Sequence, residues 1–118
     1  MIKLVITGSN GLLGQSLLNL LLQEKEKYQI FGFSRGENRS GRTDFNYISI
    51  DITDEKKLKK ALLEIKPNFI INTAAMTQVD DCEIHKKACD LLNVEVVKWL
   101  SQVSVEINSH VIHIYLNY

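Results

Sequence analysis

The feature that most constrains this fold is a glycine-rich segment that lies between an apolar run and a leucine-rich stretch. The apolar run covers residues 2–7, the segment at 8–14 has the pattern G-x-x-G-x-x-G, and the leucines after it recur at helical spacing. A strand, a glycine turn and a helix in this order form a cradle for the phosphates of a dinucleotide. Three closely spaced glycines also occur in ordinary loops, so the strand and helix context carries the prediction.

Each glycine has its own predicted role. Gly8 lets the chain turn sharply off the strand, Gly11 lets a pyrophosphate approach backbone N–H groups, and Gly14 lets the helix pack close to the strand. The helix N-terminus adds partial positive charge. The predicted phosphate site consists of Gly8, Asn10, Gly11, Leu12, Leu13 and Gly14.

Two hydrophobic periods alternate along the rest of the chain. Short apolar runs predict strands at residues 2–7, 29–33, 47–50, 69–71 and 111–114. Helical spacing predicts helices from Leu13 to Leu21, from an N-cap at Thr53 to Pro67, and over 81–105. The expected buried side of the third helix carries Ala88, Leu92, Val96, Trp99 and Val103. Residues 34–46 are polar and predict a loop.

Apolar strands that alternate with amphipathic helices predict an α/β fold with a parallel sheet and helices on both faces. Right-handed crossovers give a doubly wound, Rossmann-like sheet with strand order 3-2-1-4-5. The 118 residues suit one domain. Because the strand order reverses between the first and fourth strands, we expect a ligand to bind there.

Further candidate residues follow the second and fourth strands. Ser34 and Arg35 stand where NAD-preferring folds place an acidic residue, and an arginine there suits a 2′-phosphate, so NADP is favoured over NAD. A solvated Arg35 is the alternative, and Arg39 or Arg42 could share the role. After the fourth strand, the small pair Ala74 and Ala75 lets backbone approach a ribose or nicotinamide; a tight strand-to-helix turn is the less favoured alternative.

The motif Thr7-Gly8-x-x-Gly11-x-x-Gly14 resembles the extended short-chain dehydrogenase/reductase family. Residues 72–83 resemble its segment Asn-x-Ala-Ala-x-Thr-x-Val-Asp-x-Cys-Glu, above all in the dTDP-4-dehydrorhamnose reductases and related sugar-nucleotide reductases. The resemblance covers essentially the whole chain. It implies that Asp51 and Ile52 lie against an adenine, that Ala74, Ala75 and Met76 line the cofactor site, and that Asn93 lies beneath the active site. Alternatively, Asp51 starts the next helix and Asn93 is a polar residue at the edge of an apolar stripe.

The resemblance also implies catalytic groups that this chain lacks. The family uses a Ser or Thr after the fifth strand and a Tyr-x-x-x-Lys pair, in which the lysine lowers the tyrosine pKa. Within the chain no lysine stands four residues after a tyrosine, at Tyr28, Tyr47, Tyr115 or Tyr118. We therefore expect no catalytic residues here, a truncated family member, and a substrate domain that would follow residue 118.

Two functions remain open on this basis, and with them whether the chain is an enzyme. The first is the NADP-binding part of a sugar-nucleotide reductase of dTDP-rhamnose biosynthesis, inactive alone. The second is a non-catalytic nucleotide-binding module that resembles the regulatory subunit of methionine adenosyltransferase. In either case the expected ligand is a dinucleotide, and a sugar-nucleotide substrate is expected only for a full-length relative.

Charge and composition argue against several other classes of protein. Fourteen basic and fourteen acidic residues cancel, which argues against a nucleic-acid partner, and no apolar stretch suits a membrane span. No secretion signal is visible, so we expect a cytoplasmic protein with reduced thiols. Cys82, His85 and Cys89 could share a helix face, but three ligands without a fourth make a metal site the less favoured prediction. One of His110 and His113 is expected to face the core, and an exposed fifth strand predicts self-association.

Overall fold

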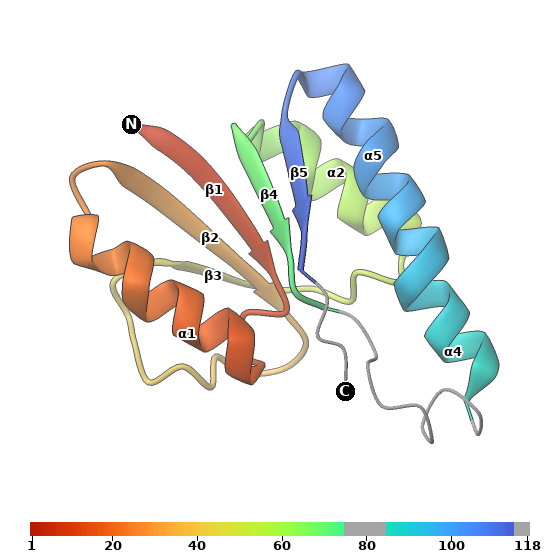
Figure 1. The fold of residues 1–118 in the computed structure, drawn as a ribbon, viewed down its shortest axis with the longest axis horizontal. Helices are drawn as coiled ribbons and strands as arrows, with labels where there is room; N and C mark the ends of the chain where they lie inside the picture. Colours follow the sequence, from red (N-terminus) through yellow and green to blue (C-terminus); the bar gives the residue numbers. More distant parts are fainter. Residues whose placement is uncertain (75–84, 115–118) are drawn as a thin grey trace.

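Five parallel strands form one sheet in the order β3-β2-β1-β4-β5 (Figure 1). This is a computed structural model, and it describes residues 1–74 and 85–114. The strands are β1 Ile2–Thr7, β2 Tyr28–Ser34, β3 Asn46–Ser49, β4 Phe69–Asn72 and β5 His110–His113. The predicted doubly wound, Rossmann-like sheet is confirmed, with its switch point between β1 and β4.

Helices cover both faces of the sheet (Figure 1). The described helices are α1 Leu12–Leu21, α2 Glu55–Ile65, α4 Lys86–Asp90 and α5 Val96–Ile107, with a short 3-10 turn at Leu22–Glu24 and a π-helical segment at Leu91–Glu95. Helix α1 lies against one face, and α2 and α5 lie against the other. As predicted, residues 35–45 contain no helix.

The side-chain alternation of β1 explains why both faces need a cover. Leu4 and Ile6 are buried in a cluster with Leu18 of α1, whereas Val5 is buried among residues of α2 and α5. Because successive side chains of a strand point to opposite faces, a continuous apolar strand supplies both clusters. The central position of β1 follows from this apolar run.

The long helix differs from the predicted one. Its fully buried side chains include Leu100, which the predicted stripe left out, while Ala88 is exposed. Val96 and Val103 are buried as predicted, and the N–H of Val96 donates to the carbonyl of Leu91, five residues back. This π-helical turn carries one residue more than an α-helical turn, so a single 3.6-residue period does not hold along the segment. Residues 81–84 of the predicted helix lie outside the described residues.

Helix α2 begins one residue later than predicted. The N-cap is Asp54, whose side chain accepts a hydrogen bond from the N–H of Lys57 at 3.2 Å. Thr53, the predicted cap, instead donates its hydroxyl to Asp51 at 2.6 Å. Both residue types are good caps, and the prediction at Thr53 was wrong because the neighbouring carboxylate engages its hydroxyl first.

We expect Asp54→Ala to lower the free energy of unfolding by about 1 kcal/mol, because the mutation removes the acceptor for an unpaired helical N–H. Urea denaturation measures the loss. Asp54→Asn keeps a capping oxygen and serves as the control, so it is expected to stay close to the unmodified chain. Equal losses in the two variants would mean that charge at this position matters more than capping.

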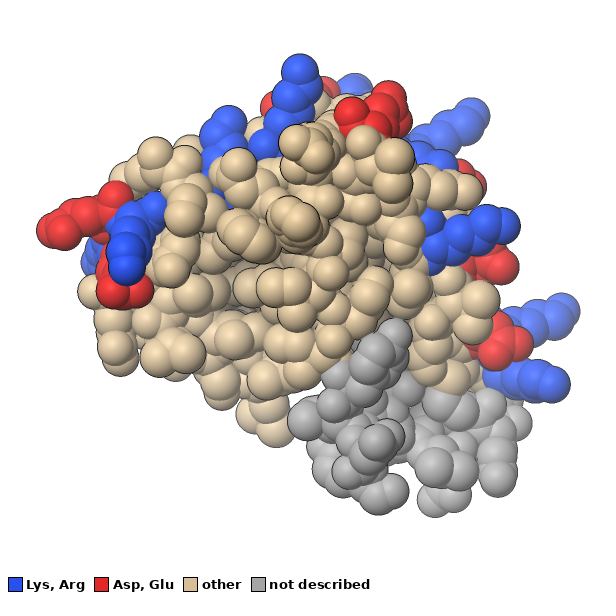
Figure 2. All heavy atoms as spheres, turned by 45° about the horizontal axis from the view of Figure 1, so that its top comes forward, with Lys and Arg blue, Asp and Glu red and all other residues tan. Residues whose placement is uncertain are grey.

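On the face shown in Figure 2, acidic and basic side chains lie next to one another. The described residues on this face form no continuous patch of one charge. Several are paired, as in the Lys59–Glu55 salt bridge at 2.7 Å on α2. Among the residues that the structure describes, no helix combines the length and the apolar character of a membrane span.

Candidate functional site

The glycine turn joins β1 to α1 and is tied to β2. The N–H of Gly8 donates to the carbonyl of Phe33 at 2.8 Å, and the N–H of Gly11 donates back to the carbonyl of Gly8 at 3.0 Å. Gly8 has a φ of +77°, a left-handed conformation that favours glycine. A Cβ on Gly8 would also lie 2.7 Å from the hydroxyl of Thr73. The sharp turn predicted at this position is present.

Gly14 and Gly11 differ in what surrounds them. A Cβ on Gly14 would overlap the carbonyl oxygen of Gly8 and lie 2.8 Å from the Cα of Ser9, so the first turn of α1 packs directly on the glycine turn. Gly11 has φ −75° and ψ 169°, which any residue can adopt, and its Cβ would meet only the Gly8 carbonyl oxygen at 3.4 Å. The fold requires glycine at position 14 but not at position 11.

A cavity of about 490 Å³ lies at the switch point of the sheet, beside Gly11. It is lined by residues from the glycine turn, from the ends of β2, β3 and β4, and from the helix around the π-helical segment. Seven predicted site residues line it: Gly8, Gly11, Ser34, Arg35, Asp51, Ile52 and Ala74. Thus segments far apart in the sequence meet at one opening.

The other predicted site residues have different surroundings. Leu12 is 91% exposed, and Gly14 is buried beneath the turn. Leu13 and Asn93 are half-buried, and the amide of Asn93 donates to Sγ of Cys89 at 3.0 Å. None of these four lines the cavity. Ala75 and Met76 lie outside the described residues.

Asn10 contacts the loop after β2 rather than the cavity. Its Nδ2 donates to the carbonyls of Arg35 at 3.2 Å and Glu37 at 2.9 Å, and its Oδ1 accepts from the N–H of Arg39 at 2.8 Å. The hydroxyl of Tyr47 donates to the carbonyl of Gly36 at 2.7 Å. These bonds hold the loop that carries Arg35 against the glycine turn.

Asp51 shapes the turn before α2, as the alternative interpretation of its sequence position predicts, and it also lines the cavity. Its Oδ1 accepts from the N–H and the hydroxyl of Thr53 at 3.0 and 2.6 Å, and its carbonyl accepts from the N–H of Asp54 at 3.0 Å. The bonds from Thr53, and the charges of Arg35 and Lys57, hold the pKa of the Asp51 carboxyl below its usual value. Asp51 therefore shapes the turn before α2 and stays an ionised acceptor at the cavity wall.

The three candidate arginines are in different environments. Arg42 binds Asp44 through two hydrogen bonds of 2.9 and 2.6 Å, which together with Lys25 hold the pKa of Asp44 far below its usual value. Arg39 lies outside the cavity lining, whereas Arg35 lines the cavity. Among the described residues, no carboxylate lies within salt-bridge distance of Arg35. Its charge is available for a ligand.

A polar network at the strand ends was missed by the sequence reasoning. The hydroxyl of Thr7 donates to Oδ1 of Asn72 at 2.5 Å, and Nδ2 of Asn72 lies 3.2 Å from Nδ1 of His113. Burial lowers the pKa of His113, which favours the neutral imidazole. His110 is exposed, and its ring stacks on the ring of Phe69 with the two ring centroids 5.7 Å apart. The network therefore links the carboxyl ends of β1, β4 and β5 beside the cavity.

The metal alternative gains no support from the described residues, which contain no group of three His, Cys, Asp or Glu side chains that could hold an ion. Cys82 lies outside them. Cys89 is disulfide-bonded, so the expectation of a reduced thiol there is wrong. That expectation considered the cellular compartment alone, which does not decide whether two sulfur atoms lie within bonding reach.

The sheet order, the glycine turn and the cavity at the switch point together define a Rossmann-like domain of the short-chain dehydrogenase/reductase type. A family model described as the RmlD substrate binding domain matches residues 2–118, and the chain belongs to this family.

Individual relatives agree with this assignment. The chain is 31% identical to dTDP-4-dehydrorhamnose reductase of Aggregatibacter actinomycetemcomitans over 118 residues, which are 100% of this chain and 36% of the relative. It is 26% identical over 116 residues to methionine adenosyltransferase 2 subunit beta of Xenopus laevis, covering 98% of this chain and 33% of the relative.

A solved structure resembles the fold closely. The crystal structure of a hypothetical dTDP-4-dehydrorhamnose reductase from Sulfolobus tokodaii superposes with a TM-score of 0.79 at 32% identity, over 96% of this chain and 38% of the other. The chain thus resembles dTDP-4-dehydrorhamnose reductase and spans little more than a third of the length of such relatives.

Proposed function

We propose that these residues are the NADP-binding domain of a sugar-nucleotide reductase related to dTDP-4-dehydrorhamnose reductase. The observation that carries the proposal is Gly11. Its backbone conformation suits any residue and a side chain there would meet almost no protein atoms, yet it lines the cavity at the switch point. A bare backbone at this place leaves room for a pyrophosphate.

The N-terminus of α1 fits the same role. The cap residue Gly11 offers no side-chain hydrogen bond and the first turn has no acidic residue, whereas α2 is capped by Asp54. The first N–H groups of a helix have no intrahelical partner, and a phosphate satisfies them while interacting with the positive end of the helix dipole. In the proposal, the N–H groups of Leu12, Leu13 and Gly14 bind the pyrophosphate.

The remaining residues are assigned from their positions around the cavity. Asp51 would accept from the exocyclic amine of the adenine beside Ile52, and Ser34 and Arg35 would bind the ribose with its 2′-phosphate. Ala74, which lines the cavity, would lie toward the nicotinamide. Ala75, Met76 and Asn93 are assigned to the cofactor site on the family resemblance alone. The bound cofactor would supply a hydride; this chain's residues would bind and orient it.

The reductase activity and the sugar-nucleotide substrate are proposals for the whole protein, because the relatives are almost three times as long as this chain. The 118 residues contain no Tyr-x-x-x-Lys pair. We therefore propose that this chain alone binds cofactor without reducing a sugar nucleotide. A cytoplasmic location, self-association through β5 and the lack of nucleic-acid or membrane partners stay predictions.

Calorimetric titration with NADP and NAD tests the proposal. We expect the chain to bind NADP more tightly, because a charge-assisted bond between Arg35 and a 2′-phosphate contributes about 1.5–3 kcal/mol. Arg35→Gln should therefore lose about tenfold or more in NADP affinity and little in NAD affinity.

Arg39→Gln is the matched control for this titration, since Arg39 lies in the same loop but outside the cavity lining. Failure of the unmodified chain to bind either dinucleotide would refute the proposed function. Equal affinities for NADP and NAD would refute only the assignment of Arg35.

A second candidate function is a non-catalytic regulatory module. It is favoured by the similarity to methionine adenosyltransferase 2 subunit beta, which extends over 98% of this chain. Size-exclusion chromatography with a methionine adenosyltransferase catalytic subunit separates the two candidates. A stable complex supports the regulatory module, and independent elution of the two proteins supports the reductase domain.

A further inference from the structure

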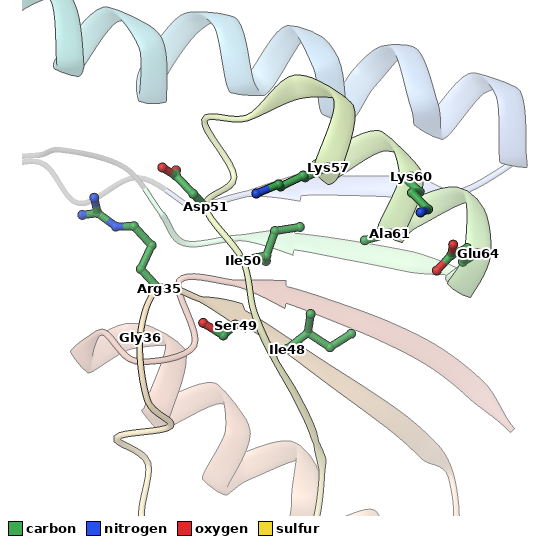
Figure 3. Close-up of a pocket in the computed structure, with 10 residues that line it drawn as sticks. All are labelled: Arg35, Gly36, Ile48, Ser49, Ile50, Asp51, Lys57, Lys60, Ala61 and Glu64. Carbon is green, nitrogen blue, oxygen red and sulfur yellow. The ribbon is translucent and has the colours of Figure 1, made fainter.

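A second cavity, of about 530 Å³, lies on the outer side of the segment that connects β3 to α2 (Figure 3). Its apolar part includes Ile48 and Ala61, and its polar part includes Lys57 and Lys60 of α2. Arg35, Ile50 and Asp51 line both this cavity and the cavity at the switch point. The two cavities are therefore neighbours that share one wall.

Two cationic side chains, Arg35 and Lys57, lie at or beside the wall that the two cavities share. In Figure 3 the side chains of Arg35 and Lys57 flank Asp51 from opposite sides, and both charges act on the Asp51 carboxyl. Neither cation forms a salt bridge with Asp51, and among the described residues Lys57 forms one long salt bridge, to Asp54 at 4.0 Å. Lys60 lies farther along α2 beside Glu64. The two cations thus lie beside Asp51, which already accepts two hydrogen bonds from Thr53, and of these two cations Asp54 contacts only Lys57.

This charge arrangement selects a class of ligand. A phosphomonoester carries nearly two negative charges and several acceptor oxygens, so two cations from different elements can bind it together. A dinucleotide whose pyrophosphate lies over Gly11 and whose adenine reaches Asp51 would present its ribose substituent at the shared wall. With a neutral hydroxyl there, Arg35 would have no salt-bridge partner among the described residues, and Lys57 would have only its 4.0 Å contact with Asp54.

We propose that the second cavity is an anion subsite in which Lys57, together with Arg35, binds the 2′-phosphomonoester of the cofactor's adenosine. The inference rests on the proposed function and adds a specificity-determining residue from α2, an element that supplies none of the residues assigned above. Lys57 acts by direct contact with the phosphate, and Asp51 lies between the two cations.

Calorimetric titration of the 118-residue chain with NADP, NAD and adenosine 2′,5′-bisphosphate tests this subsite. Lys57→Gln is expected to weaken NADP and adenosine 2′,5′-bisphosphate about tenfold, the lower range for a charge-assisted bond at an exposed lysine, and to change NAD affinity less than about twofold. Lys57→Arg keeps the charge and should retain most of the NADP affinity.

Lys56→Gln is the matched control, because Lys56 is exposed on α2 and outside the cavity lining. Thermal unfolding shows whether each variant is folded. An unchanged NADP affinity in Lys57→Gln, or an equal loss for NADP and NAD, overturns the subsite while NADP binding by the unmodified chain upholds the proposed function. If the unmodified chain binds neither dinucleotide, both fail.

Discussion

Gly11→Val is expected to abolish measurable dinucleotide binding in a chain that still folds. The added side chain would project into the cavity at the switch point, where the structure offers it almost no protein contact. A pyrophosphate would then lose two or more charge-assisted bonds to backbone N–H groups, at about 1.5–3 kcal/mol each. This corresponds to a loss in affinity of about 100-fold or more.

Valine is a poorer N-cap than glycine, so we expect Gly11→Val to lower the free energy of unfolding by about 1 kcal/mol. Calorimetry measures the binding and urea denaturation the stability. Ser16→Val is the control, because it places the same side chain at an exposed position of α1. Undiminished affinity in Gly11→Val would show that no phosphate lies over the turn.

The second large effect is on stability. Gly14→Ala is expected to lower the free energy of unfolding by about 3 kcal/mol or more, although alanine favours helix by about 1 kcal/mol over glycine. The new Cβ would overlap the carbonyl oxygen of Gly8 and lie 2.8 Å from the Cα of Ser9. These are backbone atoms of a turn that is hydrogen-bonded to β2, so they cannot move aside without breaking it.

Urea denaturation measures this loss, with Gly36→Ala as the control. Gly36 has a φ of +73° and no atom within 4 Å of an added Cβ, so its variant pays only the strain of a left-handed residue, about 1 kcal/mol. If Gly14→Ala costs no more than Gly36→Ala, close packing of α1 on the glycine turn is not what requires glycine there.

The sequence was sufficient for the strand order and for the approximate limits of the strands. Those predictions rest on short-range periodicity, and β1 shows why they succeed: Leu4, Val5 and Ile6 are all buried, as a strand covered on both faces demands. The glycine turn could also be predicted from the sequence, because the glycine spacing and the flanking strand and helix lie within one short segment.

Other features depend on helix irregularities or on contacts between distant residues, and a local hydrophobic period indicates neither. The π-helical segment at Leu91–Glu95 shifts the buried side of the long helix, so that Leu100 is buried and Ala88 lines the cavity instead. Asn72 binds Thr7, 65 residues away, and contacts His113, 41 residues away. The sequence shows that these residues are polar but not that the ends of three strands bring them together.

The central position of β1 also bears on how the chain folds during synthesis. Of the five strands this one is made first, yet it pairs on one edge with β2 and on the other with β4, whose Asn72 lies opposite Thr7. All neighbouring strands in the sheet are parallel, so none of them forms a hairpin. Two strands can therefore pair only after the crossover segment between them has been made. The unit β1-α1-β2 can form early, but one edge of β1 stays open to other chains until residues 69–72 have left the ribosome.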